Sequence, residues 1–463
     1  MEITKMYDYM LSVLDKAENG PVVEEKDWDL QYINHNIKEL VKKYDIGWEK
    51  DVLVPSDDAL ADRLYAAGRE LALEVGVYCL DTKRQMKWSP DELDYILSTA
   101  PDEETIGTGD DQVTIRHRMP EENTRVTTIG GPYGTPVSEE LYVPIMVSYA
   151  QERVLDYIDV ASLVSTHGRP IKAGSPWEAV GCWQEAQLSF EVLEKVGRPG
   201  MPIGCAEDSP SEIGELSSCT YGGYRQTDWH HASFISELKV AYSELTKSMH
   251  YQHTKSFAHN FYNTIYGGYV GGAEGMAVAI VAGVMLMKAT LNGTTFNPGP
   301  SHAHLSCNTF PKMIPSLSLG FQAISRNTKL LTSSFPRPVG GPCTKELLYE
   351  SATMAVATVP AGISIMEGIQ SAAGRITNHV TGLEARFLAQ VAQASVGLTR
   401  KEANRLANIL VPLYADKQKL GAALKGKSFT EAYDLKTIQP TAEWQGIYEE
   451  VCREVEELLG LSL

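Results

Sequence analysis

Short apolar stretches alternate with helix-like stretches over most of this chain, and no other feature constrains its fold as strongly. The clearest unit has a helical pattern over 177–196, which Gly197 and Pro199 end. A short apolar strand at 201–203 follows, and small and polar residues come directly after it. A helix, a stop, a strand and a polar loop together form one repeat of an alternating α/β fold.

The same alternation recurs between residues 104 and 398. It predicts strands at 158–163, 200–204, 218–223, 264–269, 301–306 and 329–333, and more weakly at 375–377. It predicts helices at 138–154, 176–196, 231–251, 273–288, 310–326, 344–359 and 383–396. Seven or eight such units in one chain favour a (β/α)8 TIM barrel over a doubly wound sheet.

The two ends of the chain are predicted to be helical. Residues 1–103 carry helix start signals such as Ser89-Pro90-Asp91-Glu92, which places proline and acids in the first turn. Residues 399–463 have a helical pattern again. We expect an N-terminal helical extension over 1–103, a barrel over 104–398 and a C-terminal helical segment over 399–463, all in one globular unit.

The charge balance narrows the classes of partner. The 41 basic and 59 acidic residues give a net charge of −18, which argues against nucleic acid and anionic membranes. No signal peptide is visible at the amino terminus. The most apolar segment, 275–287, is too short to span a bilayer and predicts a buried helix. The seven cysteines are scattered without a CxxC pair, which indicates a reducing cytoplasm.

Active sites of alternating α/β folds lie where strands give way to loops. Gly204, Cys205 and Glu207 follow the strand at 201–203 and therefore occupy a position typical of functional residues. The glycine-rich run at 267–272 has neither the P-loop lysine nor the G-x-G-x-x-G spacing, so we interpret it as a turn at the barrel mouth.

A zinc site is a second hypothesis for the residues near the predicted strand ends. His302 and His304 are two apart, so they face one side of a strand. Cys205, Cys219 and Cys307 also lie near predicted strand ends, and thiolates with a histidine are ligands that zinc prefers. The alternative, which is the commoner case, is that each is an isolated polar lining residue or a buried small hydrophobe.

Aromatic residues are concentrated between 221 and 269. Those near loops, Tyr221, Tyr224, Trp229 and Phe261, could form the walls of a pocket. Aromatic faces attract cations, and quaternary ammonium groups are their usual guests. Packing in the core is the commoner role for such residues and remains open for each of them.

Several motifs resemble the monomethylamine:corrinoid methyltransferase family. They are Gly-Gly-Pro-Tyr-Gly-Thr-Pro at 130–136, Gly-Arg-Pro-Gly-Met at 197–201, Tyr-Gly-Gly-Tyr-Val-Gly-Gly at 266–272, Gly-Pro-Cys-Thr at 341–344 and Thr-Gly-Leu-Glu-Ala-Arg at 381–386. The likeness spans essentially the whole chain in order. It implies a TIM barrel, a homo-oligomer (a hexamer), and methyl transfer to cobalt in a separate corrinoid (cobalamin) protein, with no cofactor held tightly by this chain itself.

The centre of the site departs from that family. Members that act on monomethylamine carry pyrrolysine at the position that falls on Gly204 here, whereas Glu207 matches a family glutamate. Two other pocket glutamates are replaced by His231 and Phe261. A glutamine and a tyrosine of the same pocket fall at about Phe335 and Arg337.

Glycine cannot supply the electrophilic imine of pyrrolysine, so the donor must carry its own leaving group. A neutral methylamine would have to expel a strongly basic amide ion, whereas a quaternary ammonium leaves as a neutral amine. Phe261 offers such a cation an aromatic face, and Glu207 could balance its charge. Arg337 could bind a carboxylate through its planar fork, which would favour a betaine.

The main hypothesis is a methyltransferase that moves a methyl group from a quaternary or otherwise activated N-methyl compound to the cob(I)alamin of a partner protein. His231 would then protonate the departing amine. The alternatives are zinc-dependent transfer from methanol, a thiol or a thioether, with Cys205, His302 and Cys307 as ligands, or transfer from monomethylamine if residue 204 is a recoded position. A barrel that binds a methylated solute without catalysis is the alternative of another class.

Overall fold

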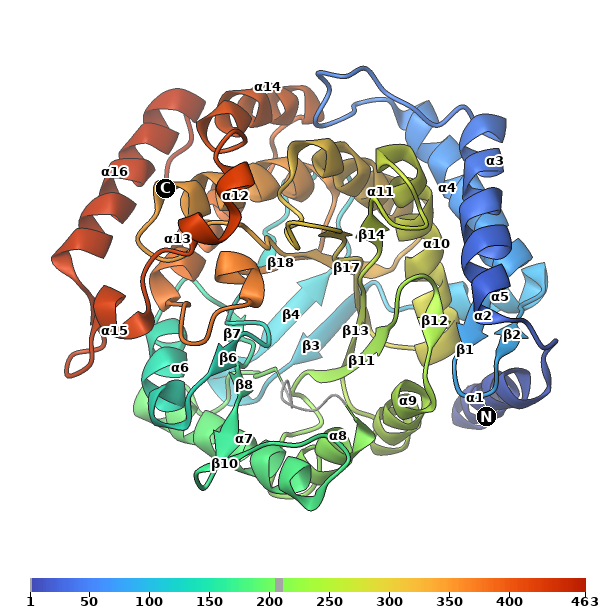
Figure 1. Ribbon diagram of the computed structural model, residues 1–463, viewed down its shortest axis with the longest axis horizontal. Helices are drawn as coiled ribbons and strands as arrows, with labels where there is room; N and C mark the ends of the chain where they lie inside the picture. The colour runs from blue at the N-terminus through green and yellow to red at the C-terminus, as the bar shows by residue number, and fades with distance from the viewer. Residues whose placement is uncertain (1, 205–210) are drawn as a thin grey trace.

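Eight parallel strands close into a barrel in the computed structural model, which describes residues 2–204 and 211–463. Seven of the strands form one sheet, in the order β11 (His230–Phe234), β13 (Ala258–Tyr262), β15 (Thr295–Asn297), β17 (Leu331–Ser334), β18 (Ile365–Gly368), β5 (Thr127–Gly130) and β7 (Tyr157–Ile158). The eighth, at 203–204, bridges Ile158 on one side and Trp229 on the other and so completes the circle (Figure 1).

A helix follows each strand and lies on the outside of the barrel, where it forms a ring in Figure 1. In chain order these are α6 (Tyr142–Ala150), α7 (Pro176–Lys195), α8 (Glu212–Ser218), α9 (Tyr242–Thr254), α10 (Ala273–Leu291), α11 (Ile314–Asn327), α12 (Lys345–Thr358) and α13 (Gly382–Ala394). The predicted (β/α)8 TIM barrel is therefore confirmed.

Several strands lie at other positions than the sequence pattern predicted. The expected strand at 218–223 is the end of α8 and a turn, and the expected helix at 231–251 begins as strand β11. The barrel strands β13, β15 and β18 precede the segments expected at 264–269, 301–306 and 375–377. The cause is polar residues inside the strands, such as the two histidines that open β11, which break the apolar pattern expected of a buried parallel strand.

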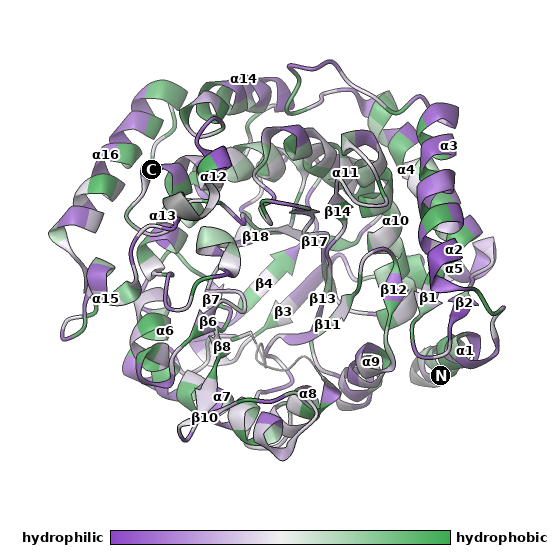
Figure 2. Ribbon diagram, viewed as in Figure 1, coloured by the Kyte–Doolittle hydropathy of each residue, from purple (hydrophilic) through white to green (hydrophobic). Residues whose placement is uncertain are grey.

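The N-terminal extension packs against one side of the ring. Its helices α3 (Asn36–Lys43), α4 (Asp58–Val75) and α5 (Pro90–Ser98) pack against α10, and α1 (Glu2–Asn19) contacts it through the Tyr9 hydroxyl, which donates to Ala289 O at 2.8 Å. In Figure 2, hydrophilic and hydrophobic residues alternate along α3, as expected of an amphipathic helix with one buried face. Strand β1 (Val77–Cys79) pairs in parallel with β12 (Lys239–Val240), which joins the extension to the segment after β11.

Helix α10 is long and apolar enough to cross a membrane by length and composition, but 94% of its apolar window is buried inside the protein. It packs between α4, α11 and the barrel strands. The predicted buried helix at 275–287 is therefore confirmed and is a few residues longer than expected.

The bottom of the barrel is covered by a hairpin of β3 (Glu103–Ile106) and β4 (Val113–Arg116). Its turn reaches the starts of two barrel strands, because Gly107 N donates to Thr227 O at 3.4 Å and Thr108 N donates to Gly200 O at 2.9 Å. The opposite end, where the strands finish, carries the candidate site.

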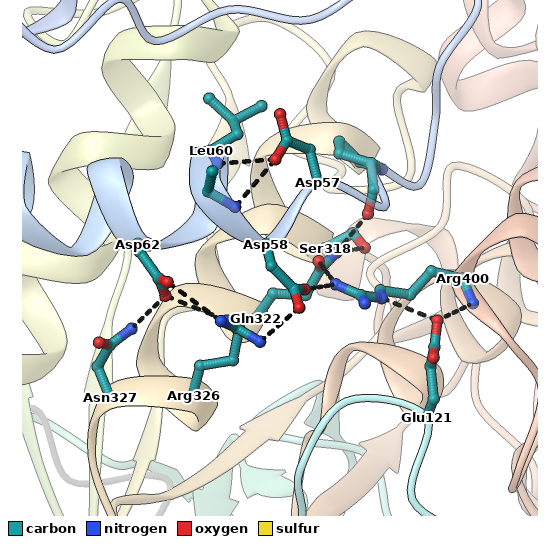
Figure 3. A network of polar contacts seen from close by, with 12 residues as sticks. Asp57, Asp58, Leu60, Asp62, Glu121, Ser318, Gln322, Arg326, Asn327 and Arg400 are labelled. Carbon is teal, nitrogen blue, oxygen red and sulfur yellow. Dashed lines mark hydrogen bonds and ion pairs between the residues drawn. The ribbon is translucent and has the colours of Figure 1, made fainter.

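Polar contacts join the two terminal parts to the barrel (Figure 3). Arg400, in α14 (Arg400–Leu410), donates to Asp58 of α4, to Gln322 of α11 and to Glu121, at 2.7, 2.9 and 2.9 Å. Further along, α16 (Ala442–Leu459) packs on α12 and α13. These contacts support the expectation of one globular unit, and the boundaries after 103 and 398 remain a proposal.

Candidate active site

A cavity of about 120 Å³ opens at the carboxyl ends of the barrel strands. Its lining residues come from every quarter of the barrel: Tyr133, Asp159, Trp229, His231, His259, Phe261, Asn297, Phe335, Arg337, Glu367 and Gln370. Two of them carry carboxylates, four are aromatic and one is a guanidinium. This is the position at which TIM barrels carry their active sites.

Gly204 lies beside the carboxylate of Asp159. A Cβ atom built on Gly204 would lie 1.9 Å from Asp159 Oδ1, which is closer than any real contact. The backbone is held there by strand pairing, since Gly204 N donates to Ile158 O at 2.8 Å and Asp159 N donates to Gly130 O at 2.8 Å. With Asp159 in this place, the site has no room for a side chain at residue 204.

Glu367 forms the second acidic corner of the cavity and is 1% exposed. Asn297 Nδ2 donates to Glu367 Oε2 at 2.7 Å. His259 Nε2 lies 3.9 Å from Glu367 Oε1, and its Nδ1 lies 2.8 Å from Thr295 Oγ1. Burial, together with the neighbouring His231, holds the pKa of His259 well below its usual range, so this imidazole is neutral at physiological pH.

His231 points into the cavity between His259 and Phe261, with ring centroids 6.2 and 6.3 Å away. Its Nε2 lies 3.1 Å from Ser233 Oγ. Burial and the positive charge of Lys247 lower its pKa to about 4. At neutral pH the imidazole therefore holds no extra proton to give to a departing amine, which weighs against the acid role expected from the sequence.

Four aromatic rings form a wall around the carboxylates. Tyr133 stacks on Phe335 with centroids 5.8 Å apart and meets Trp229 edge-on at 6.0 Å. Phe335 also packs against Phe261 at 5.8 Å. Aromatic faces beside carboxylates attract cations, so this wall and the acidic corners are suited to a positively charged guest.

Arg337 is the cation that lines the cavity. Its Cζ lies 5.1 Å from the centre of the Phe335 ring, and its Nε donates to Gln370 Oε1. Burial lowers its pKa to about 10, so it stays charged at neutral pH. Over the described parts of the chain, no carboxylate pairs with this guanidinium. Among the described residues its side-chain hydrogen bond goes to the neutral amide of Gln370, so the guanidinium is suited to an anionic group on the ligand.

Three further polar atoms of the lining are buried without a hydrogen-bond partner among the described residues. They are the hydroxyl of Tyr133, Nε1 of Trp229 and Oδ1 of Asn297. Buried polar groups in native proteins are nearly always paired, and exceptions often mark a place that a ligand or water fills. These atoms therefore add one acceptor and two donors that a bound molecule could satisfy.

Five of the residues predicted from the sequence line this cavity, namely Trp229, His231, Phe261, Phe335 and Arg337, and Gly204 lies against Asp159 of its lining. The predicted Cys205 and Glu207 lie outside the described residues. The assignment of Tyr221 and Tyr224 to the substrate pocket is corrected. Tyr221 is fully exposed, and the Tyr224 hydroxyl donates to Glu185 at 3.0 Å, because both follow α8 on the outer side of the barrel.

Sequence reasoning missed Asp159, His259, Asn297, Glu367 and the pair Tyr133 and Gln370. Asp159 fell within the expected strand at 158–163, and Glu367 lay in a segment with no predicted strand. The sequence signal for such residues is a carboxylate or amide directly after a short apolar run. This signal predicts a site residue only where the end of the strand is correctly predicted as well.

The zinc alternative has two members among the described residues. His302 lies in β16 (Ser301–His302), and its Nδ1 already accepts hydrogen bonds from the backbone of His304 and Leu305, at 3.2 and 3.3 Å. Burial and the charge of Glu350 raise the pKa of the Cys307 thiol to about 12, so the thiol stays protonated. Both observations favour the interpretation of His302 as an isolated polar residue and of Cys307 as a buried thiol, and the zinc site stays a prediction.

Comparison with known proteins shows that nearly the whole chain is similar to one group of enzymes. A family model described as monomethylamine methyltransferase MtmB matches residues 7–461. The monomethylamine methyltransferase MtmB of Methanosarcina mazei is 33% identical over 444 residues, which cover 96% of each protein. The crystal structure of the Methanosarcina barkeri monomethylamine methyltransferase superposes with a TM-score of 0.95 at 31% identity and covers 98% of each chain. The structure of a hydroxylamine MtmB complex matches equally well.

Proposed function

Because the chain belongs to the monomethylamine methyltransferase family and is a methyltransferase, we propose that it moves a methyl group from a small methylated ammonium compound to cobalt in the corrinoid of a partner protein. The observation that carries this proposal is the Asp159 carboxylate beside Gly204. It fills the space that a reactive side chain would need, so the donor has to bring its own leaving group.

The charges of the cavity fit such a donor. Asp159 and Glu367 supply two negative charges against the single positive charge of Arg337, so the lining attracts a cation. The cavity measures about 120 Å³. A cavity of about 150 Å³ accommodates benzene, so the ammonium end of such a donor fits. The aromatic wall then covers the methyl groups, which need no hydrogen bonds.

Catalysis in this site consists mainly of positioning. The reduced corrinoid supplies the nucleophile, and a bond from cobalt to the methyl carbon forms as the bond from carbon to nitrogen breaks. The electron pair of that bond stays on nitrogen, so the product leaves as a neutral amine. The carboxylates and rings hold the ammonium centre, fix the direction of the methyl group and exclude water.

Arg337 extends the proposal to a donor with a carboxylate, which is a betaine. Its guanidinium lines the same cavity as the two acidic corners, so the lining offers both signs of charge. A zwitterion would place its ammonium group at Asp159 and Glu367 and its carboxylate at Arg337. Glu207, which lies outside the described residues, keeps its proposed role of balancing the cation.

Monomethylamine is the second candidate donor, because it is the substrate named for the relatives. One feature of the site favours it. Oδ1 of Asn297 and the carboxylates of Asp159 and Glu367 are hydrogen-bond acceptors, and a protonated methylamine carries N–H donors that a quaternary ammonium lacks. Held as a cation, it would leave as neutral ammonia without help from an imine.

A panel of methyl donors distinguishes the quaternary ammonium, betaine and monomethylamine hypotheses. The enzyme is incubated with cob(I)alamin and tetramethylammonium, glycine betaine, a sulfonium compound or monomethylamine, and methylcobalamin is followed by its absorption. We expect the quaternary donors to react. Turnover of monomethylamine alone would favour the second candidate. Binding of these solutes without any loss of cob(I)alamin would overturn the methyl-transfer proposal in favour of a binding barrel.

The variant Arg337→Met, assayed on the same panel, tests the hypothesis that the donor is a betaine whose carboxylate binds Arg337. We expect KM for glycine betaine to rise at least tenfold, since a buried carboxylate would lose its partner, while KM for tetramethylammonium changes little. Equal effects on both donors would contradict a carboxylate contact at Arg337.

Family membership also supports three coarser proposals. We expect a homo-oligomer, with the corrinoid protein docking over the open end of the barrel, and a cytoplasmic location. Light scattering of the purified protein tests the first. A change in the oligomer's mass on adding the corrinoid protein tests the docking.

A further inference from the structure

We propose that Glu215, Cys219 and His230 form a binding site for a zinc-like divalent metal ion on the outer side of the barrel wall. The three side chains are at most 2% exposed, and their ligand atoms all lie within 4.8 Å of one another. Glu215 and Cys219 are one helical turn apart at the end of α8, and His230 is the first residue of β11. The site is separate from the cavity in which methyl transfer is proposed.

The ligand set is one that zinc prefers. A thiolate, an imidazole nitrogen and a carboxylate are its three common protein ligands, and tetrahedral sites hold them about 2.0–2.3 Å from the ion. Ligand atoms arranged in this way are about 3–4 Å apart. His230 Nδ1 already lies 3.0 Å from Glu215 Oε1, so a small separation of these two groups would admit an ion.

The second nitrogen of His230 fixes which atom faces the ion. Nε2 lies 3.0 Å from the backbone oxygen of Arg225, which can only accept a hydrogen bond. Nε2 therefore carries a hydrogen, and Nδ1, once it gives up the proton that it shares with Glu215, is the atom whose lone pair can reach the metal. A histidine held through its other nitrogen by a backbone carbonyl is the usual arrangement around bound zinc.

The charges of the cluster also balance with a divalent ion. A thiolate and a carboxylate bring two negative charges into a buried place, and one divalent ion neutralises both. Binding would release the thiol proton of Cys219 and the proton shared by His230 and Glu215. No electron is transferred, so the step needs no oxidant or reductant.

The site has an entry route. A cavity of about 610 Å³ on the outer side of the barrel is lined by Cys219, His230 and His250, among other residues. His250 donates through Nε2 to the backbone oxygen of Cys219 at 2.8 Å and so holds the end of α8 in place. Three protein ligands and an accessible cavity leave a fourth position for water.

The location suggests a structural purpose. His230 and His231 are adjacent in β11, and alternate residues of a strand point to opposite faces. His231 lines the substrate cavity, whereas His230 faces α8 on the outside. A metal ion would therefore fasten α8 to the strand that carries His231.

Cobalt(II) is the probe, because a thiolate bound to cobalt gives a charge-transfer absorption in the near ultraviolet. The full-length protein is freed of metal with a chelator, and cobalt(II) is added without any methyl donor or corrinoid. We expect about one cobalt ion per chain, the charge-transfer band, and loss of the band when zinc is added.

Cys219→Ser should remove the band and weaken binding at least tenfold, and Glu215→Gln should weaken binding while keeping the band. Cys182→Ser, at a buried thiol outside the cluster, is the matched control and should behave as the wild type. Cys307→Ser separates this site from the zinc alternative near the substrate cavity. Circular dichroism shows that each variant is folded.

Absence of a stoichiometric cobalt ion in the wild type would overturn the proposal, as would a band that survives in Cys219→Ser. Because the measurement uses no donor and no corrinoid, its failure would leave the proposed methyl transfer untouched. Failure of methyl transfer with cobalt bound would leave the metal site standing.

Discussion

Gly204 and Asp159 show at the scale of single residues how this site differs from one built around a side chain at position 204. Asp159 Oδ1 lies only 1.9 Å from the position that a Cβ atom of residue 204 would take. The missing side chain of Gly204 therefore leaves no empty volume, because the Asp159 carboxylate fills it. The two positions have to be considered as a pair.

We expect Gly204→Ala to lower the free energy of unfolding by about 1–3 kcal/mol, because the methyl group overlaps Asp159 Oδ1 in a closely packed place. Asp159→Ala in the same chain should recover most of that loss, although it should reduce methyl transfer. Urea unfolding of the two single variants and the double variant measures the coupling. Additive effects would contradict the contact.

His231 gives a pH dependence with a definite sign. Its imidazole takes up a proton near pH 6.5 in the unfolded chain and near pH 4 in the folded protein. Between these values the unfolded chain binds more protons, so acid favours unfolding. Stability from this group is complete above about pH 6.5 and is lost as the pH falls toward 4.

His231→Gln removes this titration. The difference in unfolding free energy between variant and wild type should shift in favour of the variant by about 3 kcal/mol between pH 7 and pH 4. Urea unfolding at several pH values measures it. A difference that does not change with pH would show that the imidazole titrates alike in both states.

At the scale of elements, close packing between helices and strands sets the barrel's shape. A Cβ atom at Gly283 of α10 would lie 2.3 Å from the ring of Tyr262 in β13, so this glycine lets the helix approach the strand. Gly446 of α16 has no heavy atom within 4 Å of its Cβ position and is exposed. The same residue type therefore has opposite consequences in the two helices.

Gly283→Ala should destabilise the protein by about 1–3 kcal/mol through overpacking. Gly446→Ala is the matched control and should stabilise it by about 0.5–1 kcal/mol, because alanine loses less conformational freedom in a helix. Denaturant midpoints of both variants provide the measurement. Equal changes in the two would contradict the packing described for α10.

The whole molecule depends on contacts between its three parts, and Arg400 is central among them (Figure 3). It is 8% exposed and contacts Asp58, Gln322 and Glu121, which belong to the N-terminal extension and the barrel. A cation in this place links all three parts of the chain.

We expect Arg400→Met to lower the free energy of unfolding by about 1.5–3 kcal/mol, which is the usual loss for hydrogen bonds to a charged group. Lys419→Ala is the control. Its pair with Asp416 spans 3.9 Å on the surface, so we expect almost no change. A small effect of Arg400→Met, equal to that of the control, would show that the parts hold together without this network.

The sequence predicts the positions of helices better than the positions of strands. The helices at 176–196 and 273–288 were placed within a few residues, because their length and caps are local signals. The strands β11 and β13 were misplaced, since His230, His231, His259 and Asn260 break the apolar pattern. The polar residues that line the site are thus the same residues that interrupt the apolar pattern from which its strands could have been predicted.

The sequence by itself determined the α/β alternation, the membership in a family of methyltransferases and the glycine at position 204, because each depends on residues that are neighbours in the chain. Only the tertiary structure decided that Asp159 lies against that glycine, that Glu367 and Arg337 share its cavity, and that Tyr221 and Tyr224 do not. Closure of the barrel brings together strand ends that lie far apart in sequence, and no local pattern encodes which of their side chains meet.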